Sequence, residues 1–329
     1  MPVIYFFYAV ILGLILAAGN ADAGPVTIKF SHEKGENTPK GMGALLFKEL
    51  AEKRLPGKVA VEVFPNSQLF SVDNELHGLL LGDVQMLAPS LANLYQFNPQ
   101  IQVFELPFLF NDINALHRFQ ASDSGKSILG SLTKNGYTGL AYWDDGMKLF
   151  TATQPLRLPM DADGLTFAIN ASEIAAAEIR TVGGIPITIA QSEFYEALKT
   201  GQANGTETLW WNVYSAKLFE LQPYVVETDH AYAGFMVITN SKFWSGLPSD
   251  VRQTLTSIID DVTVEVNRLA RERAGADRQK IIDSGFSQAI PLTPDDRAKW
   301  VDAMRPVVDR FGTAIGPELL DAARSANTR

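Results

Sequence analysis

The sequence predicts an α/β protein of two domains whose sheets are mostly parallel. The chain has 329 residues, which is enough for two domains of ordinary size. Patterns typical of strands and of helices alternate along it, as in proteins built from βαβ units. One helical pattern, at 248–284, is also longer than a small domain is wide. The 46% hydrophobic and 20% charged content indicates a globular protein with a real core.

The N-terminal part of the chain alternates short strands with helices. The predicted elements are strands at 26–32, 58–65 and 84–90 and helices at 40–54 and 74–82. Pro65 ends the second strand and Gly82 closes the second helix. The helix at 40–54 is amphipathic, and its predicted apolar face is formed by Met42, Leu45, Leu46 and Leu50.

The alternation continues through the rest of the chain. We expect strands at 139–143, 164–170 and 231–240 and a helix at 192–199. Ser192 is a residue type that caps helix starts, and Gly201 suits a helix end.

The segment 248–284 predicts one long helix, because only Gly275 interrupts its helix-forming residues. Gly285 is the expected C-terminal cap. At about 1.5 Å per residue the helix is roughly 50 Å long. It is either an ordinary surface helix or one that ties two domains together, with an apolar stripe formed by Val251, Leu255, Ile258, Val262, Val266 and Leu269.

The N-terminus predicts a signal peptide over 1–23. An apolar run from Val3 to Ala18 precedes Ala21-Asp22-Ala23, which fits an A-x-A cleavage site. The alternative is an uncleaved membrane anchor, although the run is short for a membrane span of about 20 residues. No Lys or Arg precedes the run, which is unusual for a signal peptide. We expect the mature protein to be exported to the periplasm.

Charge and motif content favour binding over catalysis. The net charge of −9 argues against a nucleic-acid partner. The four histidines show no metal-ligand spacing, and the absence of cysteine excludes disulfides and thiolate metal sites. There is no nucleophile elbow, phosphate-binding loop or complete dinucleotide fingerprint. We therefore expect no catalytic residue, metal or cofactor.

The strand at 164–170 has one unusual face. Leu165, Phe167 and Ile169 point to one side. The opposite side is small and uncharged, so it is either plain core or the wall of a site, and it is formed by Thr166, Ala168 and Asn170.

Several local sequences together resemble one family. These are GKVAVEVFPNSQLFSVDNELHGLLLGDVQM, FELPFLFND, YWDDGMKLFT, SEFYEALKTGQANGTE, KLFELQPYVVETDHAY and NSKFWSGLPSDVRQTL. In this order they resemble the periplasmic solute-binding subunits of TRAP transporters, of the C4-dicarboxylate-binding type. The resemblance covers essentially the whole mature chain.

The resemblance implies a two-lobed periplasmic-binding-protein fold with a long helix spanning both lobes. Such proteins have no catalytic activity. They close on a small solute by a hinge motion and deliver it to the membrane subunits of a sodium-coupled TRAP permease. We expect a monomer, with lobe one at 24–147 and 234–274 and lobe two at 148–233 and 275–329.

The resemblance also places the ligand-binding residues. The family usually has an arginine at the position of Ala168, where it grips a ligand carboxylate, and another at Lys148. The other expected binding residues are Glu33, Ser90, Trp143, Asp145, Asn170, Gln191, Glu207, Thr208, Trp210 and Trp211.

The missing arginine leaves the ligand open. Glu33 and Asp145 could pair with an ammonium group and a tryptophan could cover it, so a small amine, an amino alcohol or a polar neutral solute is favoured. The alternative is a carboxylate held by Lys148 alone. A periplasmic enzyme on a similar scaffold, or a binding protein that serves a sensor, also remains open.

Overall fold

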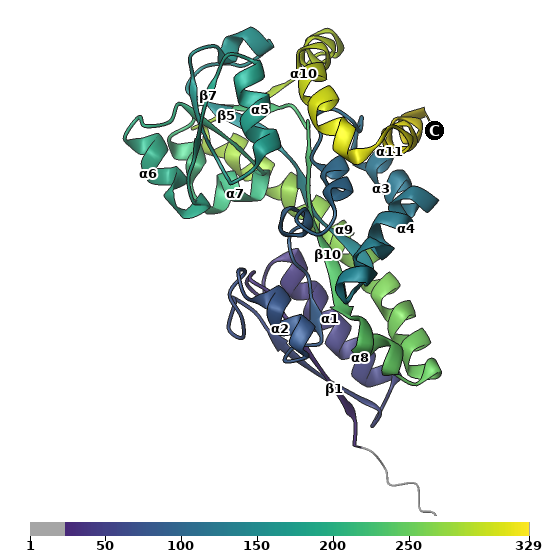
Figure 1. Cartoon of the computed structure of the whole chain (residues 1–329). Coiled ribbons are helices and arrows are strands. Elements are labelled where there is room, and N and C mark those ends of the chain that lie inside the picture. The colour runs from purple at the N-terminus through teal and green to yellow at the C-terminus, as the bar shows by residue number, and fades with distance from the viewer. Residues whose placement is uncertain (1–23, 329) are drawn as a thin grey trace, which may run out of the picture.

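The computed structural model describes residues 24–328. The signal peptide expected at 1–23 lies outside these residues. Within them the chain forms two separate sheets (Figure 1), one in each of two lobes. No helix among the described residues is long and apolar enough to cross a membrane.

The first sheet has the strand order β2-β1-β3-β10-β4. Strands β1, β2 and β3 are parallel, whereas β10 runs antiparallel to both β3 and β4. The bounds are β1 (Val26–Ser31), β2 (Val59–Phe64), β3 (Met86–Leu87), β4 (Tyr137–Met147) and β10 (Tyr232–Asn240).

The second sheet has the order β11-β9-β5-β8-β6-β7. Here β5 is antiparallel to both of its neighbours, and the other pairs are parallel. The bounds are β5 (Leu149–Ala152), β6 (Thr166–Ile169), β7 (Ile185–Thr188), β8 (Gly205–Thr208), β9 (Tyr224–Glu227) and β11 (Gln288–Pro291). Both sheets are therefore mixed, with two of four strand pairs parallel in the first sheet and three of five in the second.

The antiparallel strands are those at which the chain passes between the sheets. β4 belongs to the first sheet and β5 to the second, with only Lys148 between them, and the chain returns between β9 and β10. The two crossings are hydrogen bonded to each other, because the Lys148 N–H donates to the Ala231 carbonyl at 2.7 Å and the His230 N–H to the Lys148 carbonyl at 3.2 Å.

Helices cover both sheets. Around the first sheet and its connections lie α1 (Pro39–Arg54), α2 (Glu75–Leu81), α3 (Ile113–Ala121), α4 (Asp123–Gly130) and α8 (Ser241–Gly246). Around the second lie α5 (Glu173–Thr181), α6 (Phe194–Lys199) and α7 (Trp210–Ser215), and the chain ends with α10 (Pro294–Ile315) and α11 (Pro317–Ser325).

The long helix is present and joins the two lobes. Helix α9 (Ser249–Ser284) ends at Gly285, whose φ of 72° is the left-handed conformation expected of a glycine cap. It packs on α1 and β4 of the first lobe and on α7 of the second. Figure 1 shows α9 and β10 running through the region between the lobes. This confirms the two-lobed fold predicted from the sequence.

Helix α1 begins one residue before its predicted start, and its buried face only partly matches the predicted one, since Leu46 and Leu50 pack against the core. Met42 and Leu45 are 43% and 39% exposed. The buried apolar residues are Gly43, Ala44, Phe47 and Ala51. The reason is the close approach of α9: a Cβ on Gly43 would lie 2.3 Å from Cγ2 of Val266.

Gly43→Ala is therefore expected to lower the free energy of unfolding by about 1–3 kcal/mol, because the added methyl overpacks this contact. The matched control is Gly275→Ala on α9, where an added Cβ meets no atom within 4 Å. That change is expected to stabilise the protein by up to about 1 kcal/mol through helix propensity. Urea denaturation of both variants measures the two effects, and equal stabilities would contradict the packing described for α1 and α9.

Candidate functional site

A cavity of about 730 Å³ lies between the two lobes. This volume is in the range of small-molecule sites. Residues from both lobes line it, and they include nine of the twelve predicted binding residues: Glu33, Ser90, Asp145, Lys148, Asn170, Gln191, Glu207, Thr208 and Trp211.

Most of these residues lie where strands end. Glu33 follows β1, Asn170 directly follows β6, and Thr208 is the last residue of β8. Ser90 follows β3 and forms a β-bridge with Phe235. Ligands of open α/β sheets bind at the carboxyl ends of parallel strands, so this placement follows from the strand pattern.

Three predicted binding residues lie outside the cavity. Trp143 is 1% exposed, and its indole N–H donates to Oγ1 of Thr263 on α9. Trp210 lines only a second cavity of about 280 Å³, whereas its neighbour Trp211 lines both that cavity and the cleft. At the start of a helix, the side chains of successive residues point in different directions. Only one of the two indoles can therefore face the solute.

Ala168 is the third of these residues. It is fully buried in a hydrophobic cluster with Phe194, Ala197 and Leu198 of α6, which covers this face of β6. A methyl group is too short to extend past that helix, so Ala168 forms no part of the cleft wall. Asn170, two residues later, lies beyond the strand end and does line the cavity.

Lys148 is held by two carboxylates. Its Nζ lies 2.8 Å from Glu105 Oε1 and 3.1 Å from Glu207 Oε1, and all three side chains are largely buried. Burial opposes the charge of Glu207, but Lys148 and His230 outweigh it and lower the pKa of Glu207 to about 2. Burial also opposes the charge on Lys148, yet Glu105 and Glu207 raise the pKa of this ammonium above its usual value.

His230 extends this network behind the cleft. Its Nε2 lies 3.1 Å from Glu207 Oε1 and 3.4 Å from Glu178 Oε2, and its Nδ1 lies 2.7 Å from the Thr228 hydroxyl. Burial opposes protonation, but the two glutamates raise the pKa of His230 to about 9.

Glu178, Glu207 and His230 also place their donor atoms within 4.8 Å of one another, close enough to hold a metal ion. At neutral pH the imidazole is protonated, so it offers no lone pair to a metal. The Lys148 ammonium already pairs with Glu207. The donor set is therefore suited to holding protons rather than a cation.

The first lobe contributes a second ion pair. Lys40 donates to both carboxylate oxygens of Glu33, at 3.0 and 2.7 Å, and to the Ala88 carbonyl at 2.7 Å. Burial would raise the pKa of Glu33, but Lys40 outweighs it and holds the pKa below its usual value. Lys40 also lies over the Phe235 ring, 3.3 Å from its centroid.

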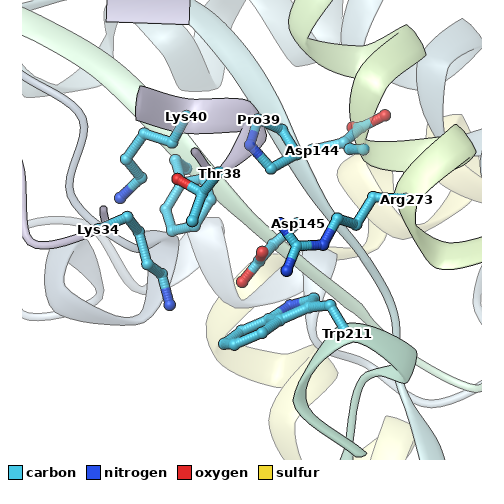
Figure 2. A pocket seen from close by; sticks show the side chains of 10 residues that line it. Lys34, Thr38, Pro39, Lys40, Asp144, Asp145, Trp211 and Arg273 are labelled. Atoms are coloured by element: carbon cyan, nitrogen blue, oxygen red, sulfur yellow. The ribbon is translucent and has the colours of Figure 1, made fainter. Parts of the chain in front are cut away.

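Asp145 and Trp211 close the cleft on the side of α9. A small pocket that adjoins the cleft is lined by both residues and by Lys34 and Arg273. Figure 2 shows the Asp145 carboxylate above Trp211, between Lys34 and Arg273. Lys34 Nζ lies 4.4 Å from the centroid of the Trp211 ring. Burial raises the pKa of Asp145.

Sequence reasoning missed three acids of the cleft: Asp73, Glu75 and Glu105. Glu105 follows a 3₁₀-helix (Pro99–Phe104) and carried no recognisable signal. Glu75 did carry a recognisable signal. It lies three residues before Gly78 and four before Leu79, so it shares the buried face of α2 with them. A carboxylate on a buried helix face is unusual unless it is paired.

The residues that line the cavity include more acids than lysines. Two lysines line it, Lys34 and Lys148. The six acids that line it are Glu33, Asp73, Glu75, Glu105, Asp145 and Glu207.

Comparisons with known proteins agree with this architecture. A "C4-dicarboxylate-binding periplasmic protein DctP" of Shewanella loihica is 45% identical over 317 residues, which cover 96% of this chain and 94% of that protein. A TRAP periplasmic solute-binding protein of Shewanella oneidensis, solved with bound succinate, superimposes with a TM-score of 0.84 at 46% identity. It covers 92% of this chain and 100% of its own.

A TRAP periplasmic solute-binding protein of Pseudomonas aeruginosa, solved with bound L-malate, gives a TM-score of 0.80 at 44% identity. It covers 87% of this chain and 100% of its own. Proteins of this kind are transport receptors and not enzymes. Residues 30–314 match the family described as "Bacterial extracellular solute-binding protein, family 7". With its two lobes, its interlobe cavity and these similarities, the chain belongs to this family of periplasmic TRAP solute-binding proteins.

Proposed function

We propose that this receptor captures a small organic solute between lobe one (24–147 and 234–274) and lobe two (148–233 and 275–329), closes on it, and delivers it as a monomer to a sodium-coupled TRAP permease. The two sheet crossings and α9 support this division, because they are the segments about which the lobes would rotate. The apolar N-terminal segment 1–23 supports export by a cleaved signal peptide.

We propose further that the solute carries an ammonium group, as in a small amine or amino alcohol. The excess of acids over lysines in the cavity wall carries this proposal. A cation entering this site gains from the surrounding carboxylates, whereas a carboxylate is repelled by them. Lys148, the basic residue first expected to hold a carboxylate, is already engaged by Glu105 and Glu207.

A carboxylate is the second candidate. The solutes in the two similar structures are succinate and L-malate, so the comparisons favour this candidate and give the amine no support. To bind a dicarboxylate, this chain would have to release Lys148 from its glutamates or use neutral hydrogen-bonding groups such as Ser90, Asn170 and Thr208.

A thermal-shift panel decides between the two candidates. Ethanolamine, 1,4-diaminobutane, glycerol, succinate and L-malate are each added at 10 mM, with sodium chloride matching the ionic strength. A ligand at about 100 times its dissociation constant stabilises a protein by about 2.7 kcal/mol, which is readily measured. We expect a shift with an amine and none with succinate or L-malate. The solute that shifts the melt should also reduce the radius of gyration in small-angle scattering, because the lobes close.

A shift with succinate or L-malate alone would overturn the ammonium proposal and leave the receptor function in place. Conversion of the added solute into a new compound would contradict the receptor function itself.

A further inference from the structure

Glu75 is a buried carboxylate that lines the cleft without a partner. It is 2% exposed, and its side chain forms no hydrogen bond or ion pair within residues 24–328. Helix α2 places it there, because Glu75, Gly78 and Leu79 share the face that the helix buries. A buried ionised carboxylate without a partner is costly, so this residue requires either a proton or a cation.

Lys40 is the lysine whose charge acts on Glu75 most strongly, but it is fully engaged. An ammonium group has three N–H donors. Two of them bond to the carboxylate oxygens of Glu33 and the third bonds to the Ala88 carbonyl. No donor of Lys40 remains for Glu75.

The other lysines of the cleft are also placed elsewhere. Lys148 pairs with Glu105 and Glu207, and Lys34 lies over the Trp211 ring. Asp73 is exposed, so water solvates its charge. Among the acids that line the cavity, Glu75 is thus the buried one that forms no ion pair with a basic side chain of the described residues.

We propose that Glu75 is the carboxylate that receives the ammonium group of the solute, and that it thereby selects the charge of the solute. The proposal rests on the proposed function above. It adds one residue-level contact to it, on the wall of the first lobe.

The protonation of Glu75 gives the contact a measurable signature. Burial raises the pKa of Glu75 to about 7. The positive charge of Lys40 opposes this rise, and the nearby negative charge of Glu33 adds to it. About half of the ligand-free protein then carries a proton on Glu75 at neutral pH. When the ammonium binds, the carboxyl O–H bond breaks, the carboxylate pairs with the ammonium, and the proton passes to the buffer.

The experiment uses isothermal titration calorimetry with ethanolamine and 1,4-diaminobutane on the full mature chain, in phosphate and in MOPS at pH 7. These buffers differ in ionisation enthalpy, so their heats report the protons released. We expect release of about 0.5 proton per ligand and an affinity about tenfold higher at pH 8 than at pH 6. Neither measurement depends on the folding of a variant.

Two variants then locate the effect. Glu75→Gln should weaken binding of the amine by at least tenfold and abolish proton release. Asp73→Asn removes the same charge from the same cavity at an exposed position, and it should retain both within twofold. Melting temperatures of the two ligand-free variants serve as the check on folding.

The outcomes separate this inference from the proposed function. If an amine binds to Glu75→Gln as tightly as to the unmodified protein, the role of Glu75 is wrong and the ammonium-bearing solute survives. If neither amine binds at 10 mM, or if succinate binds more tightly at pH 6 than at pH 8, both are overturned. In the latter case Glu75 acts as a neutral acid that donates to a carboxylate.

Discussion

Replacing Lys148 with methionine is expected to lower the free energy of unfolding by about 3–5 kcal/mol, because it leaves two buried carboxylates without their shared cation. Glu105 and Glu207 are both largely buried and lie within 3.1 Å of the Lys148 ammonium. Lys148 is also the single residue between the two sheets at the first crossing. Urea denaturation at pH 7 measures the loss.

Two further variants test whether the effect comes mainly from Glu105, since Glu207 still faces His230. Adding Glu105→Gln to Lys148→Met removes the buried negative charge that Lys148→Met leaves without its cation. The double variant should therefore be more stable than the single variant. Lys58→Met breaks an exposed pair with Asp250 and should change little. A Lys148→Met protein as stable as the Lys58→Met protein would show that the buried ion pairs do not stabilise the fold.

The second large effect is a loss of stability as the pH rises above neutral. In the folded protein the pKa of His230 is raised to about 9, whereas an unfolded chain has the ordinary value of 6.5. The folded state therefore holds the proton more tightly. The stabilisation is fully present below pH 6.5 and is lost as the pH rises through about 9. Its size is roughly 3 kcal/mol, from the free energy that corresponds to this difference in pKa.

Glu178 acts in the same direction at lower pH. Burial raises its pKa from 4.5 to about 7, so the folded protein again binds the proton more tightly, and stability falls as the pH rises from 4.5 to 7. Glu178 and Glu207 are the charged groups that face His230, and Lys148 lies beside Glu207. Glu178 and His230 therefore both hold their protons more tightly in the folded state, whereas Glu207, with its lowered pKa, does not.

Urea denaturation at several pH values between 7 and 9.5 tests the assignment to His230. His230→Gln should remove most of the decline in stability over this range, whatever its stability at pH 7. His77→Gln, on the exposed side of α2, is the matched control and should keep the decline of the unmodified protein. The assignment fails if His230→Gln loses as much stability across this range as the unmodified protein does.

Local patterns in the sequence were sufficient to predict the elements and much of the cleft. The long helix was predictable because its apolar stripe and its glycine cap are both read within the segment itself. The family resemblance pointed to Glu33 and Thr208, and the structure places both, with Asn170, at or just beyond strand ends that line the cavity. The stripe and the cap depend on neighbours in the chain, so the sequence alone determines them.

The tertiary structure decided which faces are buried. Helix α1 shows an apolar stripe at Met42 and Leu45, yet it buries the side of Gly43, where Val266 of α9 approaches closely. Ala168 lies on the face of β6 that could have lined the cleft, but α6 covers it. In each case the partner comes from a distant part of the chain, so no local periodicity could have shown which face it would cover.

The charges of the site were decided in the same way. The sequence shows that Lys40, Glu75 and Lys148 are present, but it does not show which carboxylate each lysine neutralises. Folding brings Glu33 and the Ala88 carbonyl to Lys40 and two glutamates to Lys148, and it leaves Glu75 facing the cavity. Residue types determine how many charges the protein has. Electrostatic pairing acts over a few ångströms in space, so only the folded chain determines which charge is left for a solute.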